Sequence, residues 1–244
     1  MLRTNCAWAA LTALMLLAAC RNEPVPADPP RDGSAAAAAT AEPRIPVTGP
    51  ERRILAFGDS LFAGYNLDPA ESYPARLEAA LRARGIDAEV ANAGVSGDTT
   101  AAGRARLAFT LDAQEEVPDL VILELGGNDL LRGLPPAQTR ENLAAMLAEL
   151  RRRGIRVLLM GMRAPPNLGA EYVAAYDAIY PELAREYGAT LVPFFLESIY
   201  DQPQLIQPDR IHPTAEGIET LVAATVDEVV EALPEEEAAR ASAG

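Results

Sequence analysis

Arg53-Ile54-Leu55-Ala56-Phe57-Gly58-Asp59-Ser60-Leu61 is the stretch of sequence that decides the fold. Its apolar run stops at Gly58, which is typical of a buried strand that enters a tight turn. Open α/β folds bind ligands at the carboxyl edge of their sheet, and a serine directly after this turn would project from that edge. Because Gly-Asp-Ser is also ordinary turn sequence, Ser60 needs support from elsewhere in the chain to count as a catalytic residue.

The sequence after this stretch alternates between short apolar runs and longer amphipathic segments. The pattern predicts further strands at residues 88–91, 120–125, 157–160 and 190–192, and helices at residues 69–84, 136–153, 171–187 and 213–233. The run at 120–125 is almost continuously apolar, as expected for a parallel strand that is covered on both faces. We therefore predict an α/β fold with three layers, in which a five-stranded parallel sheet lies between helices.

The composition limits the partners of the protein. With 244 residues, the chain is long enough for one sizeable domain and a flexible segment. Its formal net charge of −14 argues against a nucleic-acid partner, which requires clusters of Lys and Arg. The one basic cluster, Arg151-Arg152-Arg153, is more simply the cationic last turn of a helix.

The N-terminus has the pattern of a targeting segment. Arg3 precedes an apolar stretch that ends at Ala19 and is too short to span a bilayer. The sequence Leu17-Ala18-Ala19-Cys20 resembles the bacterial lipobox, in which the cysteine is lipidated. We expect residues 1–20 to be a lipoprotein signal peptide and Cys20 to carry the lipid; an ordinary secretory signal that contains a cysteine is the alternative.

Export and anchoring follow from this interpretation. The protein would be anchored to a membrane by its lipid and would face the periplasm, in the outer membrane if the source is Gram-negative. The only other cysteine, Cys6, lies inside the signal, so the mature chain has no disulfide. Residues 21–51 are rich in Pro and Ala and predict a disordered tether, and residues 234–244 predict a disordered acidic tail. The folded domain is expected at 52–233.

Polar residues that suit covalent catalysis follow the predicted strands. An activated serine needs a base and donors for the developing oxyanion. Ser60 is the candidate nucleophile, and the glycine-rich segment 92–99, which contains Gly97, can bring a backbone N–H close to a reacting atom. Asn128, in Gly126-Gly127-Asn128-Asp129, offers an amide donor.

Asp209 and His212 are the candidate orienting acid and base. His212 is the only histidine, so a serine hydrolase of this sequence has no other imidazole to use. The carboxylate of Asp209 can bond one ring nitrogen while the other faces a serine. The alternatives are that Asp209 only caps the last helix and that residues 126–129 are only a turn. A metal site is not supported, because the mature domain has no other His or Cys.

These blocks together resemble the SGNH (GDSL) hydrolases, most closely the bacterial thioesterase I/lysophospholipase L1 and arylesterase group. The resemblance covers about Arg53 to Leu233 and implies the flavodoxin-like sheet of that family. It implies that Ser60 attacks the acyl carbon, that His212 takes its proton and that Asp209 orients the ring. It also implies an oxyanion hole that consists of the backbone N–H groups of Ser60 and Gly97 and the side-chain amide of Asn128.

Arg210 departs from the family pattern, because glycine is common between the aspartate and the Ile-His pair. The arginine leaves open whether the backbone here has the conformation of the family, and it adds a positive charge near the site. We also expect the loop 165–169, which follows a predicted strand, to line the acyl groove.

The expected function is hydrolysis of acyl or aryl esters by a serine esterase, with thioesterase or lysophospholipase activity in addition. The substrate would be a small-molecule ester, and no cofactor or metal is expected. A carbohydrate or cell-wall O-acetylesterase that uses the same residues is the first alternative. A catalytically inactive binding module is the second. The sequence does not predict the oligomeric state.

Overall fold

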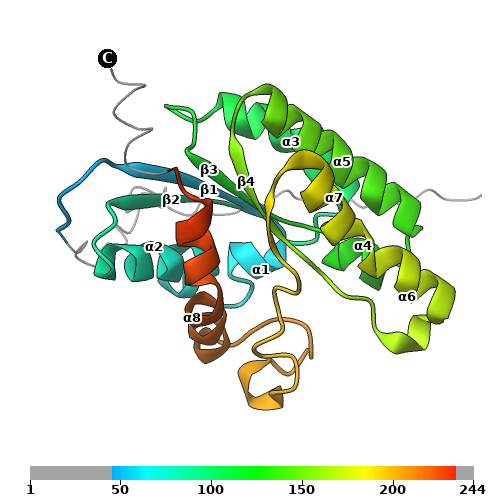
Figure 1. Cartoon of the computed structure of the whole chain (residues 1–244). Helices are drawn as coiled ribbons and strands as arrows, with labels where there is room; N and C mark the ends of the chain where they lie inside the picture. Colours follow the sequence, from blue (N-terminus) through cyan, green and yellow to red (C-terminus); the bar gives the residue numbers. More distant parts are fainter. Residues whose placement is uncertain (1–45, 235–244) are drawn as a thin grey trace, which may run out of the picture. The chain divides into compact units, whose positions relative to one another are not determined.

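A computed structural model describes residues 46–234, which contain one parallel sheet between layers of helices (Figure 1). The expected signal peptide, Cys20, most of the expected tether and the expected acidic tail beyond Pro234 lie outside the described residues. The strands are β1 (Arg52–Gly58), β2 (Ala88–Gly94), β3 (Leu120–Glu124), β4 (Arg156–Met160) and β5 (Thr190–Val192).

The strand order is β2-β1-β3-β4-β5, and every recorded pairing is parallel. This confirms the predicted α/β fold with a five-stranded parallel sheet. Because all strands run in one direction, their carboxyl ends meet at one edge of the sheet. The order reverses between β1 and β3, and ligands of open α/β sheets bind at such a switch point.

The described residues contain helices of very different length. The α-helices are α1 (Ser60–Ala63), α2 (Tyr73–Ala83), α3 (Thr100–Asp112), α4 (Gly127–Leu131), α5 (Pro136–Arg152), α6 (Ala170–Asp177), α7 (Ile179–Tyr187) and α8 (Ala215–Ala232). Three short 3₁₀ turns are η1 (Pro69–Glu71), η2 (Pro166–Leu168) and η3 (Pro203–Leu205).

Helices cover both faces of the sheet. The helices α2 and α8 pack against each other, as do α3 with α5 and α5 with α7. Figure 1 shows α1, α2 and α8 on one face and α3, α5 and α7 on the other. Every residue of β3 is buried, because this strand lies inside the sheet and has helices on both sides.

Several helices differ from the sequence-based expectation. The helix expected at 69–84 is the 3₁₀ turn η1 followed by α2, and the short helices α1 and α4 were not expected. No helix was expected between β2 and β3, where α3 lies; only Thr100, Gly103, Leu107 and Leu111 of α3 are buried, and its Phe109 is exposed. The single helix expected at 171–187 is two helices, because Pro181 has no N–H to bond the Asp177 carbonyl. The last helix begins after the cap residue Thr214, so Pro213 lies outside it.

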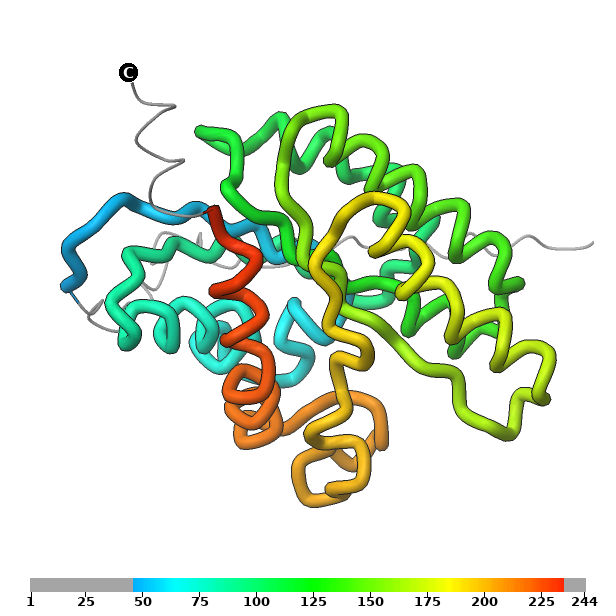
Figure 2. The backbone as a smooth tube through the Cα atoms, viewed as in Figure 1, coloured from blue at the N-terminus to red at the C-terminus, as the bar shows by residue number. Residues whose placement is uncertain are grey.

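The connection from β5 to α8 is long and returns to the carboxyl edge of the sheet. Figure 2 traces it through the yellow and orange part of the chain to the N-terminus of α8. Gln207 fastens this connection to the segment after α1, since its Nε2 donates to the carbonyl of Tyr65 at 2.9 Å. This contact places the region of His212 beside α1. Within residues 46–234, no helix has the length and apolar character needed to cross a bilayer.

Candidate active site

Ser60 lies at the turn between β1 and α1, where the backbone is tightly packed. Gly58 is the last residue of β1, and a Cβ there would lie 2.7 Å from Oε2 of Glu124 and 2.8 Å from the Phe62 ring. Only glycine fits this position, so the sequence requires it for packing. The side chain of Asp59 then accepts from the N–H of Leu61 at 3.0 Å and caps α1. Ser60 follows as the first residue of α1 and is 9% exposed.

His212 sits on a loop that Asp209 shapes. One carboxylate oxygen of Asp209, Oδ1, accepts from the N–H of Ile211 at 2.9 Å and from the N–H of His212 at 3.1 Å. Arg210, between them, has φ of 63°. This left-handed conformation favours glycine, which explains why glycine is common at this position in the resembling family. Arg210 adopts this conformation, and Asp209 still accepts from both N–H groups that follow it.

The structure brings the three predicted triad residues together. Oγ of Ser60 lies 2.8 Å from Nε2 of His212, and Nδ1 of His212 lies 2.7 Å from Oδ2 of Asp209. The ring of Tyr65 packs on the imidazole with its centroid 4.3 Å away. With Nδ1–H donating to the carboxylate, Nε2 is free to accept the serine proton. Their catalytic roles stay a prediction that this geometry supports.

The carboxyl group of Asp209 has a lowered pKa and is ionised at neutral pH. Partial burial raises the pKa of its carboxyl, but the hydrogen bond with His212 and the two backbone N–H groups outweigh burial and lower it to about 2. A charged Asp209 holds the imidazole in one tautomer and stabilises the imidazolium that forms during reaction.

The three predicted oxyanion donors lie on the loops after β1, β2 and β3. Gly97 has φ of 86°, and its carbonyl accepts from Nη2 of Arg132 at 2.7 Å. Within residues 46–234, no recorded hydrogen bond uses the N–H of Ser60 or of Gly97, so both are available to a ligand. Nδ2 of Asn128 donates one N–H to Oδ2 of Asp59 at 2.9 Å, which leaves its second N–H for the cavity.

Two tyrosines hold the turn that carries Asn128. Gly126 has φ of 122°, and a Cβ there would lie 2.1 Å from the hydroxyl of Tyr180. The hydroxyl of Tyr176 donates to the Gly126 carbonyl at 2.8 Å, and that of Tyr180 donates to the Leu125 carbonyl at 2.9 Å. These buried contacts fix the start of α4 and therefore the direction of the Asn128 amide.

Asp129 joins the turn after β3 to the loop after β2. Its Oδ2 accepts from the N–H of Thr100 at 2.7 Å, and its Oδ1 accepts from the Thr100 hydroxyl at 2.5 Å and from the Thr139 hydroxyl at 3.2 Å. Asp129 is 1% exposed. It therefore fixes the position of Asn128 relative to the loop that contains Gly97, so both donors keep their positions in the site.

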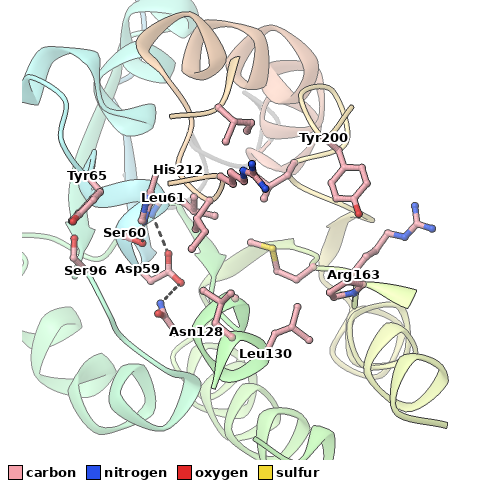
Figure 3. Close-up of a pocket in the computed structure, with 18 of the residues that line it drawn as sticks. Asp59, Ser60, Leu61, Tyr65, Ser96, Asn128, Leu130, Arg163, Tyr200 and His212 are labelled. Carbon is pink, nitrogen blue, oxygen red and sulfur yellow. Dashed lines mark hydrogen bonds between the residues drawn. The ribbon is translucent and has the colours of Figure 1, made fainter. Parts of the chain in front are cut away.

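A cavity of about 480 Å³ opens at these residues, which is within the size range of small-molecule sites. Figure 3 shows Ser60 and His212 at one end and Arg163 and Tyr200 at the other, with Leu61 and Leu130 between them. Most of the lining is apolar. Of the loop 165–169 only Pro165 lines the cavity, so the expected groove wall is formed instead by Met162, Arg163 and Pro165.

Comparison with known proteins identifies the family. The family model described as GDSL-like Lipase/Acylhydrolase family matches residues 56–219. The chain belongs to this family.

Relatives of this GDSL family are similar over most of the domain. The chain is 42% identical to the arylesterase of Vibrio mimicus over 165 residues, 68% of this chain and 82% of the relative. It is also 42% identical to the thioesterase 1/protease 1/lysophospholipase L1 of Escherichia coli (strain K12), over 67% of this chain and 76% of the relative. The crystal structure of AlinE4, an SGNH-hydrolase family esterase, is 64% identical, covers 77% of this chain and 100% of its own, and superposes with a TM-score of 0.65. The expected family and its ester-hydrolase class are thus confirmed.

Some residues of this GDSL-family site were not assigned a role from the sequence. Asp59 and Asp129 stand inside the motifs at 53–61 and 126–129, and Glu124 stands inside the predicted strand 120–125, but their contacts depend on how the strands lie side by side. Their one sequence signal is an acidic residue next to an apolar strand end, which predicts burial with a partner. No group of three or more His, Cys, Asp or Glu side chains in the described part of the chain is arranged to hold a metal ion.

Proposed function

We propose that the chain is a serine carboxylic-ester hydrolase that acts on small acyl or aryl esters through an acyl-enzyme. The observation that carries this proposal is the hydrogen-bonded series from Ser60 Oγ through His212 to Asp209, which lies at one end of a largely apolar cavity. The free N–H of Gly97 and the Asn128 amide line the same cavity. Nucleophile, base and oxyanion donors are therefore within reach of one carbonyl.

The geometry supports a two-step reaction. Oγ of Ser60 forms a bond to the acyl carbon while its proton passes to Nε2 of His212. The carbonyl oxygen becomes negative and accepts N–H groups from Ser60, Gly97 and Asn128. The tetrahedral intermediate then expels the alcohol, phenol or thiol, which takes the proton from the imidazolium. A water molecule attacks the acyl-enzyme in the same way and releases the carboxylic acid and free Ser60.

The lining supports acyl and aryl groups over sugars. Along most of its length the cavity offers Leu61, Leu130, Met162 and Phe194, which can cover a hydrocarbon chain or a ring but cannot pair with hydroxyl groups. The same chemistry cleaves a thioester or a lysophospholipid ester. Thioesterase and lysophospholipase activities are therefore part of the proposal, with support from the name of the Escherichia coli relative.

A fluorophosphonate probe and an ester series test the function. The wild-type protein should be labelled at Ser60 and should hydrolyse p-nitrophenyl esters with a preference set by acyl length. Ser60→Ala should abolish both, while Ser96→Ala, which changes another serine that lines the cavity, should still be labelled. A wild-type protein that is folded yet neither labelled nor active would favour the binding module instead. Release of acetate from acetylated glycan in excess of longer acyl esters would favour the O-acetylesterase.

We propose further that the protein is exported and anchored by a lipid on Cys20, with its enzymatic domain facing the periplasm. The support is the sequence Leu17-Ala18-Ala19-Cys20 after an apolar segment and the Pro- and Ala-rich stretch that follows. Labelled palmitate should be incorporated into the wild-type protein and not into Cys20→Ser. Equal incorporation by the two, or a wild-type protein that stays in the soluble fraction, would contradict the anchor.

A further inference from the structure

Glu124 is a buried acid that the proposed reaction does not use. It is the last residue of β3 and has 0% of its surface exposed. Its Oε2 accepts from the N–H of Asp59 at 3.2 Å. Its Oε1 has no hydrogen-bond partner among the residues that the structure describes. The carboxyl group lies directly beneath the turn that presents Ser60, since a Cβ on Gly58 would approach Oε2 to 2.7 Å.

Glu124 and Asp59 form an adjacent pair of buried carboxyl groups, and only one can carry a charge at modest cost. The side chain of Asp59 accepts from the N–H of Leu61 at 3.0 Å and from Nδ2 of Asn128 at 2.9 Å, so both of its oxygens have donors. Glu124 has one N–H donor and one unpaired oxygen. A charged oxygen without a partner is far more costly to bury than a neutral one. The charge therefore resides on Asp59.

The electrostatics of the pair agree with this assignment. Burial, followed by the charge of Asp59, raises the pKa of Glu124 well above its ordinary value. Burial also raises the pKa of Asp59, but the Leu61 N–H and hydrogen bonds with Glu124 and Asn128 oppose the rise. The interaction between the two side chains raises the pKa of Glu124 and lowers that of Asp59. A proton that stays on Glu124 and faces the Asp59 carboxylate accounts for both directions.

Within the part of the chain that the structure describes, no recorded ion pair includes Glu124 or Asp59, and the one cationic form that acts on the pair, that of His212, acts on Asp59. Tyr176 of α6 and Tyr180 of α7 interact with Glu124, and His212 of the loop before α8 interacts with Asp59. Asp129 of α4 interacts with the two tyrosines. Arg106 of α3 donates to the Gly58 carbonyl, and its charge is paired with Asp98 at 2.6 Å. A second negative charge on Glu124 would therefore have no partner of its own.

We propose that Glu124 is a positioning residue that, as a neutral acid, donates to Asp59 and through it aims the Asn128 amide at the oxyanion. Asp59 accepts one N–H of that amide, which directs the other N–H toward the cavity. Loss of the Glu124 donor lets the Asp59 carboxylate turn within its pocket, and the amide turns with it. This inference rests on the proposed ester hydrolysis, because it concerns a donor to that transition state.

Two substitutions at one position separate a neutral donor from a charged group. Glu124→Gln keeps an acceptor for the Asp59 N–H and an N–H donor for its carboxylate, so kcat should stay within about threefold of wild type. Glu124→Met keeps the volume and removes the donor, so kcat should fall about 10- to 100-fold with KM nearly unchanged, as displaced oxyanion donors do. A Glu124→Gln protein as impaired as Glu124→Met overturns the inference.

A double-mutant cycle shows whether the effect passes through Asn128. In an Asn128→Ala background the amide is absent, so Glu124→Met should lower kcat by less than about twofold. Effects that multiply in full would show that Glu124 acts by another route. Thr225→Val is the matched control, because Thr225 is buried and bonds the Tyr73 hydroxyl at 2.7 Å. It should lower thermal stability and leave kcat unchanged.

An infrared measurement reports the proton directly and does not require Glu124→Met to fold. The difference spectrum of wild type minus Glu124→Gln at neutral pH should contain the carbonyl band of a protonated carboxyl group. A carboxylate band in its place overturns the inference. Failure of the proposed function is distinguishable, because it appears in wild type as absence of both ester hydrolysis and fluorophosphonate labelling.

Discussion

Replacement of Asn128 by alanine separates the chemistry of the site from its stability. Nδ2 of Asn128 donates one N–H to Asp59 at 2.9 Å and keeps the other for the oxyanion. Loss of one oxyanion donor costs about 3–4 kcal/mol of transition-state stabilisation, a fall in kcat of about 10²–10³. KM should change little, because the donor matters most once the carbonyl oxygen is negative.

The same substitution removes a hydrogen bond to a buried carboxylate. Asp59 is 2% exposed, so its carboxylate depends on donors from the protein. A hydrogen bond to a charged group contributes about 1.5–3 kcal/mol, and a loss of that size in a domain of this length lowers Tm by about 3–12 °C. The prediction is therefore a large loss of kcat together with a moderate loss of Tm.

Steady-state hydrolysis of a p-nitrophenyl ester measures kcat, and thermal unfolding measures Tm. Asn142→Ala is the matched control, since its amide donates to the Thr100 hydroxyl at 3.2 Å and is not part of the cavity lining. It should change Tm and keep kcat within about twofold of wild type. An Asn128→Ala protein that loses Tm but keeps kcat within about tenfold of wild type would show that Asn128 only supports Asp59, and the oxyanion assignment would be wrong.

Further changes test the loops around His212. Asp209→Asn can keep the backbone acceptor but presents an amide to Nδ1, so kcat should fall about 10³–10⁴-fold from the wrong tautomer; unchanged activity would contradict the triad. Because the pKa of Asp209 is lowered to about 2, its contribution to stability is full above its unfolded pKa and is lost as pH falls from there through the folded pKa of about 2. The free energy of unfolding of Asp209→Asn should therefore fall less steeply than that of wild type over this pH range. Gly97→Ala forces alanine to φ of 86°, at about 1–2 kcal/mol, and should lower both Tm and kcat in the same assays. Arg210→Gly removes the backbone strain of an arginine with positive φ but increases the conformational entropy of the unfolded chain. Because the two effects oppose each other, its free energy of unfolding in urea should lie within about 1 kcal/mol of wild type.

The parallel sheet and the predicted site were accessible from the sequence for one reason. The apolar runs of β1, β3 and β4 stop at a glycine, and Ser60 and Asn128 follow two of these runs almost directly. Once the strands are parallel, these residues must share an edge, whatever their spacing in the chain. Ser60 and His212 come together because of the topology: the long connection 193–214 returns to the carboxyl edge of the sheet, where Ser60 lies.

The missed elements lack the signals on which sequence reasoning depends. The helix α3 buries few side chains and exposes Phe109, so its apolar residues do not mark one face. The helices α1 and α4 are too short to show a period. The break before α7 follows from Pro181, a signal that was present but was outweighed by the apolar residues on either side.

The contact between Glu124 and Asp59 is visible only in the three-dimensional structure. In the sequence Glu124 stands at the end of an apolar strand, and nothing there indicates that it lies under Asp59, far earlier in the chain. The pairing of β1 with β3 in register, Phe57 with Leu123, brings the two acids together. A role that depends on cross-strand register and on the charge state of a pair cannot be obtained from either residue alone.

The charge on Asp59 poses a problem for an oxyanion site, because a carboxylate lies behind one of the donors to a developing negative charge. The charge of Asp59 is tolerated because its carboxylate accepts from the Leu61 N–H and from the Asn128 amide. The hydrogen bond from Asn128 to Asp59 also polarises the amide, which strengthens its second N–H as a donor to the oxyanion. A second ionised group at Glu124 would add repulsion without adding a donor. Since the pKa of Glu124 is raised, its contribution to stability is full below its unfolded value and is lost as pH rises through the folded value. Wild type should therefore lose free energy of unfolding relative to Glu124→Gln as pH increases, and parallel pH curves for the two proteins would show that both carboxyl groups are ionised beneath the active serine.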